Sequence, residues 1–227
     1  MSTGLPRPLI CLVTDRFRVT PAGHASLLRL VTAAARAGVD LIQIREAGLE
    51  SGELLRLTRD AVSAVAATAA KVVVNERTDV ALAAGAHGVH LRADSASPAQ
   101  VRAVVPEGFL IGRSVHGEAE AMSPALAGAD YFIAGTVFRT ASKPADTPLL
   151  GLDGLGRISR AAGRPVLAIG GVAADNVGDL AAAGASGIAA IGLFADAFID
   201  GRDDRLDAAL RPLVARLRAP FGPPIGR

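Results

Sequence analysis

The segment KVVVNERTDVALAAGAHGVHL, residues 71–91, carries the pattern that decides the fold. An apolar run from Lys71 to Glu76 precedes an Ala-rich stretch of helical length, and a second apolar run follows from Gly88 to Leu91. Strand signals that alternate with helix signals predict parallel strands joined by crossover helices. The continuous β-branched residues 72–74 are typical of parallel strands that are buried on both faces.

The same alternation extends along the chain in both directions. Eight apolar runs are bounded by turn residues, and Ala/Leu/Arg-rich stretches separate them. Eight such units predict an α/β fold, a (β/α)8 TIM barrel, as a single domain over residues 1–219, since barrels of this kind typically need roughly 250 residues. The runs are Leu9 to Asp15, Asp40 to Glu46, Lys71 to Glu76, Gly88 to Leu91, Leu110 to His116, Asp130 to Val137, Pro165 to Gly171 and Gly187 to Leu193.

The remaining segments favour a soluble cytoplasmic protein. No charged region followed by a long apolar stretch is visible at the N-terminus. The apolar segment from Leu180 to Ile199 parses better as a helix end, a turn at Gly184, a strand and a loop than as a membrane span. We expect the lone Cys11 to be a buried thiol in a reducing compartment, and the Pro/Gly-rich residues 220–227 to be a disordered tail.

Charge narrows the choice of partners. The formal net charge is +2 and no basic cluster stands out, which disfavours nucleic acid and membrane surfaces as partners. The charge does not exclude phosphorylated small molecules as ligands. Self-association is expected only by analogy with other barrels.

The ends of the last two runs indicate a phosphate site. Gly170 and Gly171 end the seventh run, and Ile191 and Gly192 lie in the eighth. The loops after strands seven and eight often bind phosphate in such barrels, because glycine lets backbone N–H groups approach the anion. The alternative is that Gly170 and Gly171 only form a tight turn.

The loop after the sixth run strengthens this prediction. Thr140, Ser142 and Lys143 offer two hydroxyls and an ammonium within a few residues. Lys143 is one of two lysines in a chain that otherwise uses arginine, and the alternative is a solvated surface residue.

Polar residues also end the second and third runs. Alternation places Gln43 and Arg45 on the same side of their strand, facing the barrel mouth. Arg45 is a candidate for binding a second anion, or else forms an ion pair with Glu46 or a neighbour. Asn75 and Glu76 end the third run.

The fifth run supplies a candidate acid–base group. Ser114 and His116 fall on one face of the predicted strand, and histidine is suited to proton transfer near neutral pH. We therefore predict His116 as the catalytic residue, with Ser114 beside it.

These motifs resemble the thiamine phosphate synthase superfamily, which includes thiazole tautomerases. The resemblance covers the chain from the first run to Leu193 and rests on seven motifs in the expected order. They are residues 12–15 (LVTD), 43–46 (QIRE), 75–82 (NERTDVAL), 88–91 (GVHL), 111–116 (IGRSVH), 137–143 (VFRTASK) and 168–172 (AIGGV).

The resemblance implies a synthase reaction that joins a pyrimidine pyrophosphate to a thiazole phosphate with Mg²⁺, but this chain departs from the synthase pattern. Ala47 stands where synthases carry a pyrophosphate-binding lysine, and Glu76 replaces a metal-binding aspartate. Ser95 occupies the register of the second metal aspartate, with Asp94 one residue early. Because Mg²⁺ demands short, near-octahedral oxygen ligation, these shifts disfavour a metal site.

The departures favour the tautomerase-like branch, which isomerises a thiazole carboxylate phosphate by a proton shift and requires no cofactor. The resemblance then places catalysis at His116 and the thiazole phosphate at Thr140, Ser142, Gly170, Gly171, Ile191 and Gly192. At Gly192 synthases usually carry serine, so a hydroxyl contact is lost while the backbone N–H remains.

Two other hypotheses stay open. The synthase-like loop at Thr140, Ser142 and Lys143 supports a divergent thiamine phosphate synthase, a transferase in which Glu76 and Asp94 bind Mg²⁺. The third hypothesis is a non-catalytic regulator that binds a thiamine-pathway phosphate, because fold and phosphate site would look the same.

Overall fold

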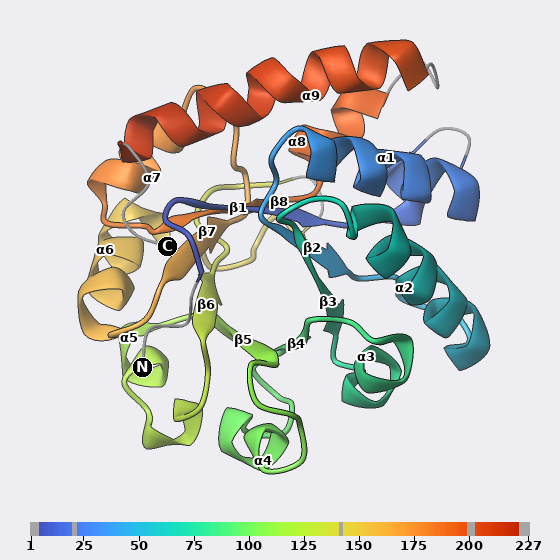
Figure 1. Ribbon diagram of the computed structural model, residues 1–227. Coiled ribbons are helices and arrows are strands. Elements are labelled where there is room, and N and C mark those ends of the chain that lie inside the picture. The colour runs from blue at the N-terminus through green and yellow to red at the C-terminus, as the bar shows by residue number, and fades with distance from the viewer. Residues whose placement is uncertain (1–4, 20–21, 141–142, 199–202, 223–227) are drawn as a thin grey trace. The chain divides into compact units, whose positions relative to one another are not determined.

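The computed structural model describes residues 5–19, 22–140, 143–198 and 203–222. The strands are hydrogen-bonded in the order β1 to β8 and form a closed barrel, which confirms the predicted (β/α)8 fold (Figure 1). The six strand pairs whose register is described are all parallel. The strands are β1 (Leu9–Val13), β2 (Leu41–Ile44), β3 (Lys71–Asn75), β4 (Gly88–Leu91), β5 (Leu110–Val115), β6 (Tyr131–Ala134), β7 (Val166–Ile169) and β8 (Gly187–Ala190).

Every predicted run contains one strand, although most runs extend past the end of their strand. The seventh run shows the reason, because Gly170 and Gly171 have φ angles of +99° and +63° and leave the extended conformation after Ile169. The polar ends of the runs therefore lie in the loops that follow the strands.

Helices separate the strands as expected. They are α1 (His24–Arg36), α2 (Ser51–Val65), α3 (Thr78–Ala84), α4 (Pro98–Arg102), α5 (Glu118–Ala121), α6 (Gly151–Ala161), α7 (Val177–Ala182), α8 (Gly192–Ala195) and α9 (Asp203–Arg218). Short 3-10 helices are η1 (Arg16–Arg18), η2 (Pro124–Leu126), η3 (Asp196–Phe198) and η4 (Ala219–Phe221).

Local sequence explains where two of these helices begin or break. The hydroxyl of Ser97 accepts from the N–H of Gln100, and the Gln100 side chain accepts from the N–H of Ser97, which forms a capping box at α4. The helical residues between β5 and β6 are divided into α5 and η2, because Pro124 starts a new segment and cannot continue the hydrogen bonding of α5.

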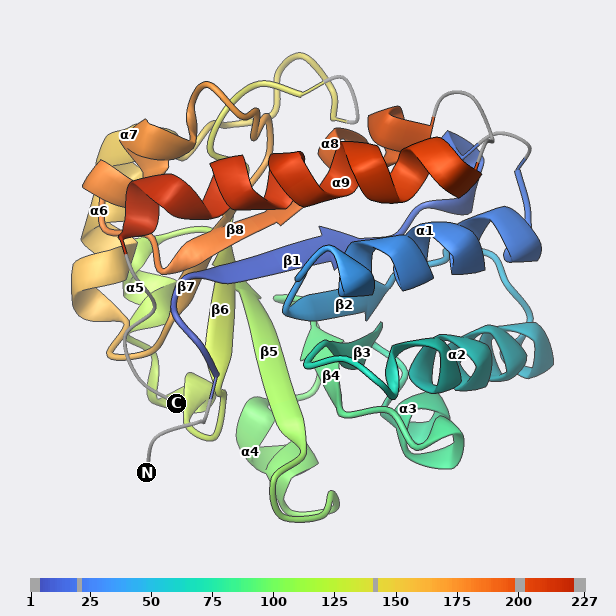
Figure 2. The same cartoon turned by 45° about the horizontal axis from the view of Figure 1, so that its top comes forward.

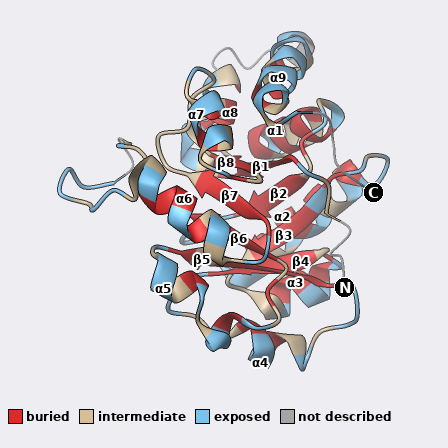
Figure 3. Cartoon of the chain, turned by 90° about the vertical axis from the view of Figure 1, so that its left-hand side faces the viewer, coloured by how far each residue is buried: buried red, intermediate tan, exposed pale blue. Residues whose placement is uncertain are grey.

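The chain folds into two compact units. Unit 1 consists of Met1–Leu9, Leu91–Ala189 and Leu217–Arg227, and holds β5 to β7 and nearly all of β8. Unit 2 consists of Ile10–His90 and Ala190–Arg216, and holds most of β1 together with β2, β3 and most of β4. In each unit the strands are buried along their length, while the helices bury one side only (Figure 3).

In unit 2, α9 lies alongside α1 (Figures 1 and 2). Leu206, Leu210 and Val214 form the buried side of α9, and Arg36 of α1 pairs with Asp207 at 3.9 Å. In the first strand Cys11 is fully buried, as predicted, and burial raises the pKa of its thiol.

The apolar segment from Leu180 onward contains the end of α7, a turn at Gly184 and β8, as expected, but the short helix α8 follows β8 where a loop was expected. Within the described ranges, no helix has both the length and the apolar character needed to cross a membrane. The predicted tail is only partly described, since η4 covers its first residues and residues 223–227 lie outside the described part.

The first residue of β8 offers a test of strand packing in unit 1. A Cβ on Gly187 would overlap the backbone carbonyl oxygen of Leu9, and backbone cannot move aside as a side-chain end can. We expect Gly187→Ala to lower the free energy of unfolding by about 3 kcal/mol in urea titrations. Gly178→Ala is the control, because Gly178 is exposed in α7 and a methyl group added there would meet no atom within 4 Å. Similar stability of the two variants would contradict this account of β8.

Candidate active site

In unit 2, the ends of β2 and β3 carry a hydrogen-bonded amide pair. Gln43 is buried, and its Nε2 donates to Oδ1 of Asn75 at 2.8 Å. The two strands are parallel neighbours, so their carboxyl ends lie at the same edge. The bond leaves the Asn75 Nδ2 group as a donor that can be offered to a ligand. The structure thus brings together two residues that the sequence predicted for the site.

Arg45, two residues after Gln43, does not form the ion pair with Glu46 that was considered from the sequence. The Glu46 side chain is 1% exposed, and its Oε2 lies 3.5 Å from Nη1 of Arg16. The same oxygen accepts from the backbone N–H of Arg16 at 3.0 Å. Burial raises the pKa of Glu46, while its bonds to Thr14 and Arg16 act in the opposite direction.

The guanidinium of Arg45 is consequently available to a ligand. Arg45 is exposed, and its backbone N–H donates to Oγ1 of Thr14 at 3.0 Å. Across the part of the chain that the structure describes, no acidic side chain lies within salt-bridge distance of Arg45.

Glu76, directly after β3, has an unusual backbone conformation. Its φ of +68° lies in the left-handed region, where the backbone conformation of a residue other than glycine costs about 1–2 kcal/mol. The conformation is fixed by the Glu76 N–H, which donates to the carbonyl of His90 at 2.9 Å. Strain of this kind clusters at functional sites, and this observation supports Glu76 as a site residue.

In unit 1, the loops after β6 and β7 pack closely through glycine. A Cβ on Gly171 would lie 2.5 Å from the carbonyl oxygen of Arg139 and 2.7 Å from Cβ of Phe138. The N–H of Phe138 donates to the carbonyl of Gly170 at 3.0 Å, and Asn176 Nδ2 donates to the carbonyl of Gly171 at 2.9 Å. Both glycines are thus required for loop packing, whether or not a phosphate binds there.

This packing holds the start of the predicted anion-binding loop. Thr140 follows Arg139 directly, and its carbonyl accepts from the Lys143 N–H at 3.3 Å. Lys143 is exposed. Ser142 lies outside the described residues. Thr140 and Lys143 therefore belong to a loop that contacts the predicted phosphate-binding glycines.

The predicted catalytic pair lies at the end of β5. Ser114 is within the strand, whereas His116 follows it and its side chain is 61% exposed. The His116 N–H donates to Oε2 of Glu120 at 2.8 Å, and the ring Nδ1 lies 3.5 Å from the same oxygen. His116 is therefore held mainly by a surface carboxylate and lacks the rigid strand setting that the sequence suggested.

Sequence reasoning missed Arg113, a buried strand arginine in unit 1. Its guanidinium donates to the carbonyls of Ala93 at 2.6 Å, Ala96 at 2.9 Å and Ser95 at 3.3 Å. All three belong to the β4–α4 loop, which carries Asp94. Arg113 is 7% exposed, so these hydrogen bonds compensate its buried charge and hold the loop in place. The one sequence signal was a charged residue inside a predicted buried strand.

The candidate metal residues belong to different units, Glu76 to unit 2 and Asp94 to unit 1. Asp94 is paired with Arg92 at 2.9 Å on the surface. No cluster of three or more His, Cys, Asp or Glu side chains suited to a metal occurs among the described residues. Mg²⁺ is commonly held by one or two carboxylates plus substrate phosphates, so the donor chemistry of these two residues suits a metal that arrives with its substrate.

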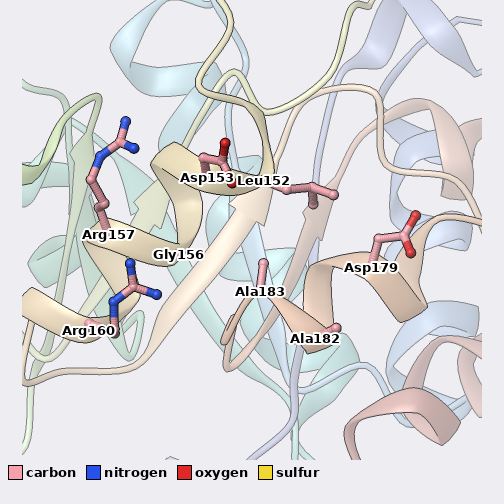
Figure 4. Close-up of a pocket in the computed structure, with 8 residues that line it drawn as sticks. All are labelled: Leu152, Asp153, Gly156, Arg157, Arg160, Asp179, Ala182 and Ala183. Atoms are coloured by element: carbon pink, nitrogen blue, oxygen red, sulfur yellow. The ribbon is translucent and has the colours of Figure 1, made fainter.

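A separate cavity of about 470 Å³ lies between α6 and α7 in unit 1 (Figure 4). Charged side chains from both helices line it: Asp153, Arg157 and Arg160 from α6, and Asp179 from α7. None of the residues predicted for the site lines this cavity.

Comparison with known proteins identifies the relatives of the chain. Residues 10–194 match the family model described as thiamine monophosphate synthase. The chain is 40% identical over 208 residues to a thiamine-phosphate synthase from Methanoculleus marisnigri, which covers 92% of this chain and 94% of the relative. It is 40% identical over 180 residues to a thiamine-phosphate synthase from Methanoregula boonei, covering 79% and 82% of the two chains.

A solved structure agrees with these relatives. The thiamine phosphate pyrophosphorylase from Pyrococcus furiosus superimposes with a TM-score of 0.78 and 30% identity. The match covers 95% of this chain and 98% of that one.

These findings correct the function predicted from the sequence. The thiazole tautomerase prediction, which made the protein an isomerase, is wrong, because relatives at 33–40% identity over most of the chain are named synthases. The transferase alternative fits better. The loss of the lysine at position 47 and the altered carboxylates were therefore overvalued as evidence against a synthase.

Arg113 offers a test of how the β4–α4 loop is held. Arg113→Met keeps much of the bulk but removes three hydrogen bonds from a charged donor, so we expect the free energy of unfolding to fall by about 3 kcal/mol. Backbone amides of residues 93–96 should also exchange hydrogen faster. Arg164→Met, at an exposed position in unit 1, is the control and should change neither quantity. Unaltered exchange in the loop of Arg113→Met would refute the positioning role.

Proposed function

The chain belongs to the thiamine monophosphate synthase family, and we propose that it is a thiamine phosphate synthase. The enzyme transfers a pyrimidine from its pyrophosphate ester to a thiazole phosphate, and pyrophosphate leaves. The observation that carries this proposal is the 40% identity to a relative named thiamine-phosphate synthase, over nearly the full length of both chains.

Residues of unit 2 suit the pyrimidine pyrophosphate. The Gln43–Asn75 pair presents oriented amide groups, which are suited to hydrogen bonds with a heteroaromatic ring. Arg45 is an exposed guanidinium that can bind pyrophosphate oxygens in a bidentate manner. Because position 47 is alanine, Arg45 carries more of this task than it would beside a lysine.

Phosphate binding is assigned to the loops after β6, β7 and β8. Lys143 supplies positive charge, Thr140 and Ser142 supply hydroxyls, and Gly170, Gly171, Ile191 and Gly192 supply backbone N–H groups. The support in unit 1 is the close packing of Gly171 against the carbonyl of Arg139, next to Thr140.

We assign Glu76 and Asp94 as the residues that would hold Mg²⁺. A bound Mg²⁺ would neutralise negative charge that develops on the leaving pyrophosphate. The strained backbone of Glu76 in unit 2 supports its assignment. In unit 1, the hydrogen bonds of Arg113 hold the backbone of the loop that carries Asp94.

Product identification tests the proposed function. With pyrimidine pyrophosphate, thiazole phosphate and Mg²⁺, we expect thiamine phosphate and pyrophosphate in equal amounts, and no product when a chelator replaces Mg²⁺. Mass spectrometry and a pyrophosphate assay measure the two products. Binding of thiazole phosphate without turnover in the complete mixture would instead identify a non-catalytic binder.

Two substitutions separate metal-assisted transfer from proton transfer. We expect Glu76→Gln to lower kcat by about 100-fold and to raise the Mg²⁺ concentration needed for half-maximal rate, since it removes charge from a metal ligand. His116→Gln, which removes proton transfer, should lower kcat by less than about tenfold, whereas loss of a true general acid–base costs about 10²–10⁴-fold. Steady-state kinetics on folded variants measure both effects, and the reverse order would place catalysis at His116.

A further inference from the structure

In unit 2, the guanidinium of Arg18 lies over Gly192. Arg18 ends η1, the 3-10 helix after β1, and Gly192 is the first residue of α8 after β8. A Cβ on Gly192 would lie 3.2 Å from Nη1 of Arg18 and 3.4 Å from its Cζ and Nη2. The absence of a side chain at position 192 therefore provides the space that the guanidinium occupies.

The backbone that carries Arg18 is firmly held. The Asp15 side chain accepts from the Phe17 N–H at 3.1 Å and caps η1, while the Arg18 N–H donates to the Asp15 carbonyl at 3.1 Å. Glu46 holds the other end of η1 through the Arg16 N–H. Val19, the next residue, is buried. Arg18 thus reaches Gly192 from a fixed base and needs no rearrangement of the loop.

The neighbouring arginine shows what is distinct about Arg18. The guanidinium of Arg16 is engaged by Glu46, by the carbonyl of Ala47 at 3.1 Å and by the ring of Phe17 at 4.3 Å. Arg18 is exposed and, throughout the described ranges of the chain, forms no salt bridge. Its charge is therefore available to an anionic ligand at the start of α8.

We propose that Arg18 determines specificity for the phosphorylated thiazole by binding its phosphate beside Gly192. This inference rests on the proposed function, because it concerns the phosphate of that reaction's acceptor substrate. A guanidinium presents N–H donors in a planar fork that fits two phosphate oxygens, and it stays charged at all physiological pH values. Arg18 provides the charge, and the absence of a side chain at position 192 gives its guanidinium room beside the backbone.

Kinetics with two acceptors test the assignment. Arg18→Gln should raise KM for thiazole phosphate by about 10- to 100-fold, with kcat and KM for the pyrimidine pyrophosphate changed less than about threefold. Activity with the unphosphorylated thiazole alcohol should not fall, so the preference for the phosphate should shrink by the same factor. The control Arg56→Gln makes the same change of charge on the exposed side of α2 and should leave all values unaltered.

Calorimetry tests the pairing with Gly192 without requiring turnover. Gly192→Ala should weaken thiazole phosphate binding in the wild-type background, because the methyl group displaces the guanidinium. In the Arg18→Gln background the same substitution should cost clearly less, since there is no guanidinium to displace. Additive effects, or an unchanged Kd in Arg18→Gln, would overturn the inference. A protein that binds thiazole phosphate through Arg18 but makes no thiamine phosphate would contradict the proposed function and leave this inference standing.

Discussion

Parallel pairing of short, buried strands is the constraint on which the candidate site depends. In unit 2, β1, β2 and β3 pair in parallel, and in unit 1, β5 to β8 do the same. Each strand is buried almost entirely, so polar groups are admitted only where the strand ends or where another group satisfies them. Parallel direction then brings those ends to one edge within each unit. Gln43 and Asn75 meet for this reason, although 32 residues separate them in the sequence.

This constraint also explains what the sequence predicted well. Eight runs of Val, Ile, Leu and Ala mark the eight strands, because parallel strands buried on both faces require such residues throughout. The cap at Ser97 is likewise local, because its partner Gln100 is only three residues away. The ends of the runs were less accurate, since a glycine such as Gly170 continues the apolar pattern while its φ of +99° ends the strand.

Contacts between residues far apart in the chain could not be predicted from the sequence. The Glu46 partner is Arg16, 30 residues away, whereas the adjacent Arg45 was the obvious candidate. Arg113 binds carbonyls 17 to 20 residues away, and nothing local identifies a backbone carbonyl as a partner. The functional error had a related origin. The departures from the synthase pattern at positions 47, 76 and 95 were interpreted as a loss of synthase activity. The sequence did not show which side chains lie beside each of these positions.

Four arginines near the strand ends have different roles because their surroundings differ. Arg113 is buried against carbonyls and holds a loop, and Arg16 is engaged by Glu46 and holds η1 to β2. Arg18 and Arg45 share the same permanent charge but remain exposed. An exposed guanidinium replaces hydrogen bonds to water with hydrogen bonds to phosphate oxygens, and the fold is not disturbed. A buried guanidinium would first have to give up hydrogen bonds that stabilise the fold. The hydrogen-bond and ion-pair partners of each arginine therefore separate the structural arginines from those proposed to bind ligand. Composition alone cannot reveal these partners.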